Sequence, residues 1–367
     1  MANKLRILLL SRYSGLGASS RMRLFQYVPF LERIGAQILI SPFFDDAYLK
    51  ELYSTRKRHF TTVAASYVRR ACALLRARSC SVVWVEKEVF PFLPAGFEAL
   101  LSHCGVPYIV DYDDAIFHTY DQHRSTWVRR ALERKLDPLL NNATHVTVGN
   151  SYLEAYVRAH GASSVTRIPT VVDITRYNVS PEPYLDTTST EFRIGWIGSP
   201  ETTKYLHLVR DALRALSAER PIRLITIGAA PLPDYGVPLE QHAWDEQTEA
   251  QLLSSIHVGI MPLMDSPWER GKCGYKLIQY MACGRPVVAS PVGVNQDIVT
   301  DRVGFLAHDT DAWLQALRLL ASDIDRRRAY GAAARERVER EFTLQVTAPR
   351  IVELLCEAAR SFPQSVR

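Results

Sequence analysis

Short runs of apolar residues recur along the whole chain, and each is separated from the next by a stretch long enough for at least one helix. Apolar strands that alternate with helices form parallel sheets whose two faces are both covered. The pattern occurs twice, so we expect an α/β chain with two doubly wound, Rossmann-like domains. The expected strands are Leu5–Leu10, Ala36–Ser41, Val82–Val85, Tyr108–Asp111 and His145–Val148 in the first half, and Arg193–Ile197, Arg223–Ile227, Val258–Met261, Pro286–Ala289 and Gly304–Leu306 in the second.

The length of 367 residues also fits two domains, at roughly 150 residues per domain. The stretch Ser180–Thr190 is rich in Pro, Ser and Thr and has no apolar period, so we expect the domains to join there. No apolar run reaches the roughly 18 to 20 residues that a membrane span needs. The six scattered cysteines include no Cys-x-x-Cys pair, which argues against a zinc site or a disulfide framework and fits a cytoplasmic protein.

Basic residues are concentrated in the first half of the chain. Residues 1–180 hold 23 Lys and Arg against 15 Asp and Glu, whereas residues 181–367 hold 21 against 24, within a net charge of +5. Between Lys50 and Arg78 the only acidic residue is Glu51. Apolar residues at intervals of three and four predict a basic amphipathic helix in this segment, and they are Tyr67, Val68, Ala71, Leu74 and Leu75.

Two interpretations of this basic segment stay open: a surface for anionic lipid head groups, and an ordinary solvated helix face. Nucleic-acid binding is disfavoured, because no recognisable binding motif surrounds the cluster and the rest of the chain is not basic.

In open α/β sheets, ligands bind beyond the carboxyl ends of the strands, so the loops at these ends carry the candidate chemistry. The first loop, Ser11–Arg23, contains Gly15 and Gly17 before a helix and is similar to a dinucleotide-binding fingerprint. Ser20 stands where that fingerprint has its third glycine, and Ser41 stands where its acidic residue is expected. A plain strand-to-helix turn is therefore favoured over a dehydrogenase.

The loop Val106–Asp121 carries a cluster of carboxylates at the end of a buried strand: Asp111, Asp113 and Asp114, with His118 four residues on. Buried carboxylates are costly unless they are solvated, paired or used. Acid–base chemistry or the binding of substrate hydroxyls would explain them. Helix capping by Asp113 or Asp114 is the alternative, and His118 fits a structural and a catalytic role equally well.

Two loops of the second half suit an anion. In the first, Gly271–Gly274 precedes a predicted helix, Tyr275–Ala282, and Gly284 is expected to be the C-cap of that helix. The helix N-terminus together with Lys272 and Lys276 would attract a phosphate, although the loop is not a P-loop. The second loop, which runs from Gly198 to Lys204, offers hydroxyl groups and one cation for the same purpose, and these residues are Ser199, Thr202, Thr203 and Lys204.

Several segments resemble the family 4 glycosyltransferases, also described as glycosyl transferases group 1. GKCGYKLIQYMACGRPVVAS, residues 271–290, is similar to the donor-site segment of that family. Residues 146–156, residues 167–173 and residues 335–343 resemble further family segments in the same order. The similarity is patchy over the first 120 residues and nearly continuous from Val146 to Thr343.

The resemblance implies a GT-B fold, in which two Rossmann-like domains face each other across a cleft. The expected domains are an acceptor-side domain at residues 1–183, a nucleotide-sugar-binding domain at residues 184–345, and a final helix at residues 346–367 that crosses back to the first domain. The resemblance further implies a retaining, metal-independent glycosyltransferase that transfers a hexosyl or N-acetylhexosaminyl group to a hydroxyl acceptor in cell-surface glycan or glycolipid assembly. It implies no cofactor, and a UDP-sugar or GDP-sugar as the co-substrate.

The site residues are carried over position by position. The donor side comprises Ser199, Lys204, Glu269, Lys272, Cys273, Gly274, Tyr275, Lys276 and Gln279. The catalytic candidates are Asp113, His118 and Lys204, and the acceptor side comprises Gly17, Ser19, Ser20, Arg21, Glu86, Glu88 and Asp114. The resemblance implies no metal ligand. Three runs match Asp-x-Asp: those opened by Asp309 and Asp323 precede helices and suit capping, and Asp111-Tyr112-Asp113 is interpreted as a contact to a polar substrate.

The chain departs from the family where the paired glutamates stand. Gly271 and Gln279 occupy those places, with Glu269 as a substitute for the first, and Ser199 replaces a common arginine. Two alternatives therefore stay open: a GT-B nucleotide-sugar epimerase, and a non-catalytic GT-B partner of a glycan-assembly complex. The expected partners are a nucleotide-sugar donor and a glycan or lipid-linked acceptor, with peripheral contact at the inner face of the plasma membrane through residues 50–78.

Overall fold

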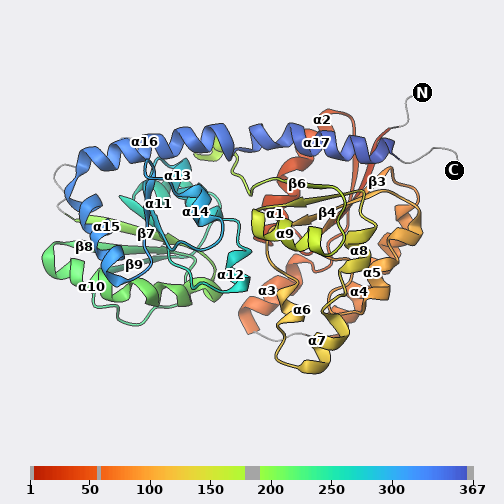
Figure 1. Ribbon diagram of the computed structural model, residues 1–367, viewed down its shortest axis with the longest axis horizontal. Coiled ribbons are helices and arrows are strands. Elements are labelled where there is room, and N and C mark those ends of the chain that lie inside the picture. The colour runs from red at the N-terminus through yellow and green to blue at the C-terminus, as the bar shows by residue number, and fades with distance from the viewer. Residues whose placement is uncertain (1–3, 56–58, 178–190, 362–367) are drawn as a thin grey trace. The chain divides into compact units, whose positions relative to one another are not determined.

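A computed structural model describes residues 4–55, 59–177 and 191–361 of the chain (Figure 1). The chain divides into two compact units. Unit 1 comprises Met1–Thr170 and Leu344–Arg367, and unit 2 comprises Val171–Thr343. The chain thus leaves unit 1 after Thr170 and returns to it after Thr343. The join expected at residues 183/184, within Ser180–Thr190, lies outside the described residues.

Unit 1 is built on a sheet of six parallel strands in the order β2-β1-β3-β4-β5-β6. Five of these strands coincide with predicted ones to within one residue at each end, whereas β6 was not predicted because its three residues, VTR, contain no apolar run. The strands are β1 (Arg6–Leu10), β2 (Gln37–Ile40), β3 (Val82–Glu86), β4 (Tyr108–Tyr112), β5 (His145–Val148) and β6 (Val165–Arg167).

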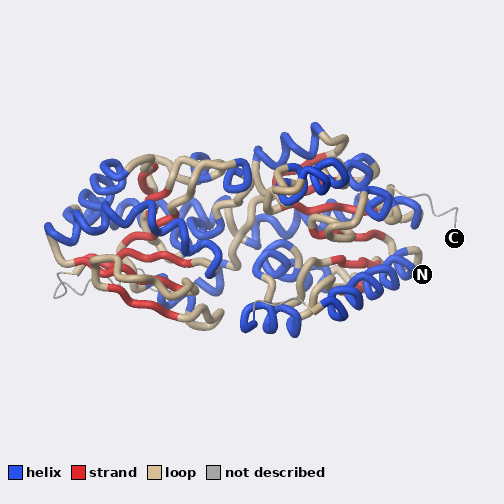
Figure 2. The backbone as a smooth tube through the Cα atoms, turned by 90° about the horizontal axis from the view of Figure 1, so that it is seen from below, coloured by secondary structure: helices blue, strands red, loops and turns tan. Residues whose placement is uncertain are grey.

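Helices cover both faces of the unit 1 sheet (Figure 2). The last helix of the chain, α17 (Leu344–Arg360), packs on β3 and β4 and on the helical turn that contains Tyr27, whose hydroxyl lies 2.9 Å from Thr347 Oγ1. The remaining helices of unit 1 are α1 (Ala18–Arg23), η1 (Phe25–Tyr27), α2 (Val28–Arg33), α3 (Asp46–Thr55), α4 (Phe60–Ala77), α5 (Ala95–Ala99), η2 (Ser102–Cys104), α6 (His118–Asp121), α7 (Thr126–Leu132), α8 (Asp137–Asn141) and α9 (Ser151–Ala159).

The segment predicted as one basic helix, residues 50–78, contains the end of α3 and the whole of α4. The predicted apolar face of the helix was also wrong. Leu74 is buried, whereas Val68, Ala71 and Leu75 are exposed. The buried face consists mainly of small residues together with Arg70, whose guanidinium donates to the main-chain oxygen of Ser11. Apolar residues thus lie on two sides of α4, and their spacing alone could not show which side packs on the sheet.

Unit 2 also contains six parallel strands, in the order β12-β11-β10-β7-β8-β9. The edge strand β9 was not predicted, because its sequence LEQH is mostly polar. The two series of strands with their covering helices confirm the expectation of two doubly wound domains. The strands are β7 (Phe192–Ile197), β8 (Ile222–Ile227), β9 (Leu239–His242), β10 (Val258–Met261), β11 (Val287–Ala289) and β12 (Gly304–Leu306).

Each face of the unit 2 sheet has its own apolar core. Along β7, Ile194 and Trp196 face one core and Ile197 faces the other, because side chains alternate along a strand. The helices of unit 2 are η3 (Ile174–Tyr177), η4 (Pro200–Val209), α10 (Arg210–Glu219), α11 (Glu249–Ser254), α12 (Pro267–Arg270), α13 (Tyr275–Ala282), α14 (Asn295–Ile298), α15 (Thr310–Ser322) and α16 (Ile324–Glu341). None of the helices in the described part of the chain has the length and apolarity needed to cross a bilayer.

Candidate active site

The two anion-suited loops of unit 2 meet at Lys276, in the first turn of α13. Its Nζ lies 3.3 Å from Thr202 Oγ1 and 4.2 Å from the ring centroid of Trp196. A Cβ at Gly198 would lie 2.5 Å from Lys276 Nζ and 2.6 Å from the Trp196 ring, so only glycine leaves room for this arrangement. The turn after β7 and the start of α13 therefore form one local site within unit 2.

The N-terminus of α13 is the anion-attracting end of this site. Gly274 caps the helix with φ +66°, and a Cβ there would collide with Ile298. The first-turn N–H groups of a helix of this length favour a negative charge. Cys273 is buried beside the cap. The predicted residues Lys272 to Lys276 are thus contiguous around one helix start.

The ammonium group of Lys276 is easily neutralised. Burial, together with the positive charge of Lys272, lowers the pKa of Lys276 to about 7. A bound phosphate would place an opposite charge beside the ammonium group and raise that pKa again. A bound anion would therefore stabilise the charged form of Lys276, which burial and Lys272 disfavour in the free protein.

Glu269 is buried on α12, close to the same turn. The hydroxyls of Ser266 and Tyr205 donate to its two carboxylate oxygens. Burial raises the pKa of Glu269, but these two hydrogen bonds and the charge of Lys272 outweigh that effect and leave the pKa below its usual value. Lys204 is exposed, with its Nζ 5.1 Å from the centroid of the Tyr205 ring. Tyr205, which the sequence analysis did not single out, thus contacts two predicted donor residues.

Gln279 and Ser199 make contacts inside the protein. Gln279 is buried, and its Nε2 lies 3.4 Å from Tyr177 Oη, which in turn donates to Glu249 at 2.5 Å. Ser199 precedes η4, and its main-chain oxygen accepts from Thr202 Oγ1 at 2.9 Å, without a capping bond from its own side chain. The contact directs Nε2 of Gln279 toward Tyr177, and the predicted contact of Gln279 with a ribose stays a prediction.

In unit 1, Asp113 and Asp114 surround Lys87. Lys87 Nζ lies 2.8 Å from Asp113 Oδ1 and 3.5 Å from Asp114 Oδ2, and the Ser19 hydroxyl donates to Asp113. Burial raises the pKa of Asp113, but the charges of Lys87 and Arg23 and the hydrogen bonds from Lys87 and Ser19 leave it below its usual value. Helix capping by either aspartate was a wrong interpretation, because α6 begins only at His118.

Lys87 itself holds a strained backbone conformation, with φ +66° at a residue that has a Cβ. The strain places its buried ammonium between the two carboxylates that follow β4. The sequence analysis missed Lys87, although its position between Glu86 and Glu88 directly after a predicted strand was a usable signal. Asp111, the third aspartate of the loop, forms a bidentate ion pair with Arg23. The Arg23 Nη2 and Nε atoms lie 2.7 and 2.9 Å from its two carboxylate oxygens.

Both ring nitrogens of His118 have partners. Nδ1 lies 2.8 Å from the Asp121 carboxylate, and Nε2 lies 2.8 Å from the Tyr152 hydroxyl. Asp121 therefore favours a proton on Nδ1 and directs Nε2 toward Tyr152. A proton transfer through His118 would pass by way of Tyr152 or require that contact to open.

The acceptor-side residues of the first loop form a connected set. Gly17 is the N-cap of α1, Ser20 Oγ donates to Glu86 Oε2 at 2.6 Å, and Arg21 donates to the main-chain oxygen of Gly15 at 3.0 Å. Glu86 is buried, which raises its pKa. These contacts fix the loop after β1 to the end of β3.

Glu88 lies in a buried ion-pair network. Arg12 and Lys135 each approach its carboxylate to 2.6 Å, and the Tyr120 hydroxyl donates to it at the same distance. Lys135 also pairs with the buried Glu98 at 2.9 Å. The assignment of Glu86 and Glu88 to the acceptor side stays a prediction. Protein groups donate to both oxygens of Glu88, whereas those that donate to Glu86 bind its Oε2.

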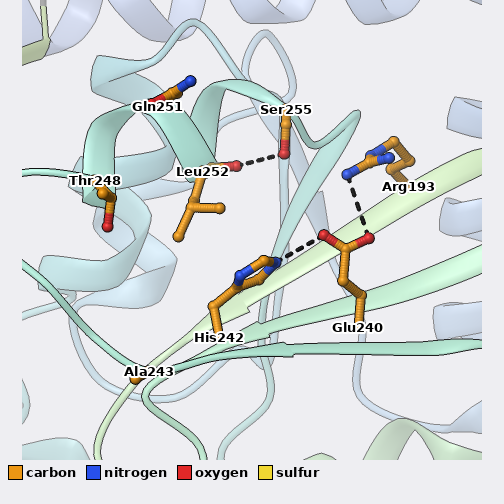
Figure 3. A pocket seen from close by; sticks show the side chains of 8 residues that line it. All are labelled: Arg193, Glu240, His242, Ala243, Thr248, Gln251, Leu252 and Ser255. Carbon is orange, nitrogen blue, oxygen red and sulfur yellow. Dashed lines mark hydrogen bonds and ion pairs between the residues drawn. The ribbon is translucent and has the colours of Figure 1, made fainter.

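Unit 2 also contains a pocket of about 400 Å³ beside its edge strand β9 (Figure 3). Glu240 lies at its base, 2.7 Å from His242 and 3.6 Å from Arg193. No predicted donor residue lines this pocket, and its lining residues are Arg193, Glu240, His242, Ala243, Thr248, Gln251, Leu252 and Ser255.

The aspartates that open two of the Asp-x-Asp runs are helix caps, as predicted. Asp309 accepts from the N–H of Ala312 at 2.8 Å, and Asp323 accepts from the N–H of Arg326 at 2.8 Å. Within residues 4–55, 59–177 and 191–361, no group of three or more His, Cys, Asp and Glu side chains is arranged to hold a metal ion.

Two family models match different parts of the chain. The model of the glycosyl transferase 4-like domain matches residues 47–171, and the model of glycosyl transferases group 1 matches residues 191–323, which include the whole Lys276 site. The chain belongs to the group 1 glycosyltransferases. The resemblance seen in the sequence is thereby confirmed.

One curated relative of this glycosyltransferase is the alpha-maltose-1-phosphate synthase of Mycolicibacterium smegmatis. The two are 35% identical over 113 residues, which cover 28% of this chain and 28% of that enzyme. The matched region thus spans little more than a quarter of the relative.

Solved structures show the fold of this glycosyltransferase. Anabaena HepE in complex with UDP superposes with a TM-score of 0.71 at 17% identity, over 96% of this chain and 100% of HepE. Sucrose-phosphate synthase of Thermosynechococcus elongatus superposes with a TM-score of 0.71 at 17% identity, over 98% and 100%. The expected GT-B fold is confirmed by these matches together with the two parallel sheets.

Proposed function

We propose that this glycosyltransferase moves a hexosyl or N-acetylhexosaminyl group from a nucleoside diphosphate sugar to a hydroxyl group of a glycan or lipid-linked acceptor. The observation that carries the proposal is the meeting of two cationic loops at Lys276, 3.3 Å from Thr202 and at the start of α13. Cations and helix N–H groups that converge on one point suit a diphosphate.

The donor is a UDP-sugar or a GDP-sugar. Support for UDP comes from the similar HepE, whose structures were solved with UDP and with UDP-glucose. Lys272, Lys276 and the N-terminus of α13 bind the diphosphate, and Lys204 reaches it from the turn after β7. Glu269, held by Ser266 and Tyr205, is placed to accept hydrogen bonds from hydroxyls of the donor.

The reaction proceeds with retention of the anomeric configuration and without a metal. The bond between the anomeric carbon and the diphosphate oxygen breaks, and the acceptor oxygen bonds to the same face of that carbon. Negative charge develops on the leaving diphosphate, where the lysines stabilise it as a metal ion would.

The acceptor proton passes to the leaving phosphate oxygen. Asp113 is the candidate protein base, but its lowered pKa makes it a weak one. We assign to Asp113 and Asp114 the binding of sugar hydroxyls instead, with Lys87 holding both carboxylates in place. His118, held by Asp121 and Tyr152, supports the same loop.

The enzyme acts at the inner face of the plasma membrane. Its reaction belongs to the assembly of cell-surface glycans or glycolipids. The basic segment of residues 50–78 supports this part of the proposal, since a lipid-linked acceptor is held at that surface.

A thermal-shift screen against UDP, GDP, ADP and their sugars tests the donor assignment, because a ligand that binds the native state raises the melting temperature. We expect one nucleotide and its sugar to raise it. Product analysis then decides between the activities. A glycoside with retained configuration supports the transferase, an epimer formed without acceptor supports the epimerase, and binding without turnover of any donor supports a non-catalytic partner.

A further inference from the structure

Helix α4 exposes a row of large apolar side chains. Phe60 is 84% exposed, Val68 is 64% exposed and Leu75 is 80% exposed. At 100° per residue the three lie within about 80° of one another around the helix, and at 1.5 Å per residue the row is about 22 Å long. Ala71, which falls between them on the same side, is also exposed. A row of this kind on a monomer marks an interaction surface.

The opposite side of α4 is fixed to unit 1. The Arg70 guanidinium, on that side, donates to the main-chain oxygen of Ser11. Tyr67 lies at the edge of the apolar row, about 20° from Phe60 around the helix, and its hydroxyl donates to the main-chain oxygen of Pro91. Ser66, Ala73, Leu74 and Ala77 complete the buried side. The helix therefore cannot turn its apolar row inward without breaking these contacts.

A second pair of exposed apolar side chains, Phe97 and Leu100, lies at α5 beyond a buried aromatic contact. The ring of Tyr67 stacks on Phe90 at 6.4 Å, and Phe90 contacts Phe97 of α5 at 6.0 Å. Phe97 and Leu100 remain 43% and 45% exposed. Two neighbouring helical segments thus present apolar side chains to solvent.

The charges on the helix itself are basic, and Glu51, which lies 3.0 Å from His59, is an acidic residue at its N-terminal end. Residues 52–78 contain no Asp or Glu, and Arg76 and Arg78 are exposed at the C-terminal end of the helix. A helix with an apolar side and arginines beside it lies in the plane of a bilayer, with the apolar side at the boundary of the acyl chains and the arginines at the phosphates. Such arginines are attracted to an anionic leaflet, and the attraction falls off within a Debye length of the surface.

We infer that α4 docks this enzyme on an anionic lipid bilayer through Phe60, Val68 and Leu75, with Arg76 and Arg78 on the lipid phosphates. The inference rests on the proposed function, because it names the surface through which the enzyme reaches a membrane-held acceptor. It does not depend on the donor chemistry of unit 2. The lack of acidic residues along the row disfavours a basic protein partner and fits a surface of phosphates.

Flotation of the full chain with lipid vesicles tests the inference. Wild type is compared on vesicles of phosphatidylcholine alone and of phosphatidylcholine with 30% phosphatidylglycerol (about a third of the lipid, enough for a strongly negative surface). We expect binding to the anionic vesicles alone, and binding that weakens as salt screens the charges. Phe60→Ser with Leu75→Ser, and separately Arg76→Glu with Arg78→Glu, are expected to weaken partitioning at least about tenfold. The matched control is Ile34→Ser with Ile324→Ser, two residues that are each 50% exposed elsewhere, and it is expected to bind as wild type does.

Three results would overturn the inference: equal binding to both kinds of vesicle, no binding to either, or wild-type binding by the Phe60→Ser, Leu75→Ser variant. A loss of self-association in that variant, seen by sedimentation, would assign the row to a second copy of the chain instead. The thermal shift with UDP is measured on the same samples. A retained UDP shift with lost vesicle binding supports the inference and shows a folded variant, whereas vesicle binding without a UDP response in wild type overturns the donor assignment alone.

Discussion

Lys276 and Thr202, 74 residues apart in the sequence, contact each other at 3.3 Å where the turn after β7 meets the start of α13. The contact joins two loops that the sequence analysis had selected separately for an anion. It also places the ammonium of Lys276 over the Trp196 ring, where burial and Lys272 lower its pKa to about 7. The proposed donor site is built on this relationship.

The affinity for UDP is expected to depend on pH through Lys276. In the free protein Lys276 is mostly charged below about pH 7 and mostly neutral above it, whereas bound diphosphate favours the charged form. Binding above pH 7 must therefore take up a proton, and affinity should fall by up to about tenfold per pH unit as the pH rises. Calorimetry between pH 7.5 and 9, in buffers of different ionisation enthalpy, measures both effects. Lys276→Gln should give a flat profile, and a flat profile in wild type would contradict the account.

Gly198→Ala is expected to weaken donor binding by displacing Lys276 and Trp196. The added methyl group would lie 2.5 Å from Lys276 Nζ and 2.6 Å from the indole, and overpacking of this kind costs about 1–3 kcal/mol of stability. Gly96→Ala is the control, because a Cβ there meets nothing within 4 Å. Thermal melts with and without UDP compare the two variants. A full UDP response in Gly198→Ala would show that the site does not need this close approach.

Lys135→Met is expected to destabilise unit 1 by about 3–5 kcal/mol, because it leaves the carboxylates of Glu88 and Glu98 buried without their shared cation. Urea unfolding measures the loss. Adding Glu98→Gln to the same variant should recover part of it, since Lys135 is the cation that pairs with Glu98, whereas Glu88 keeps its ion pair with Arg12 at 2.6 Å. If the single variant is as stable as wild type, the ion-pair network has been misassigned.

Asp113→Asn is expected to lower turnover more than donor binding. Asparagine keeps the size of the side chain but removes the charge that pairs with Lys87 at 2.8 Å. Steady-state kinetics give kcat, and calorimetry gives the donor Kd. His118→Ala should behave in the same way, through loss of the contacts to Asp121 and Tyr152. Equal losses of turnover and donor binding would point to a folding defect in place of a role in the reaction.

The elements that the sequence predicted best are buried ones. The strands of the two sheets with continuous apolar runs and the helix Tyr275–Ala282 were placed correctly. The C-cap of that helix is Cys283 and not the predicted Gly284, which follows it with φ +67°. The polar edge strands β6 and β9 were not predicted. They contain three and four residues without an apolar run, so their sequences show no hydrophobic periodicity.

The contacts between side chains were harder to predict from the sequence than the strands and helices. Spacing could not show that Arg70 packs inward while Leu75 faces solvent, because α4 has apolar residues on two sides. Nor could it show that Asp113 pairs with Lys87, a partner on another strand's loop that only the order of the parallel sheet brings near. The cationic loops were found because helix start, glycines and lysines are adjacent in the sequence.

The central claim, that Lys276 and Lys272 hold the diphosphate of a nucleotide-sugar donor, is tested most directly by kcat/KM for the donor in the alanine variants. The account predicts a fall of about 10- to 1000-fold for each of Lys276→Ala and Lys272→Ala, the size expected when a group that stabilises transition-state charge is removed. Arg318→Ala, which removes an exposed cation on α15, should leave kcat/KM unchanged. An unchanged kcat/KM in a folded Lys272→Ala, Lys276→Ala double variant would contradict the claim.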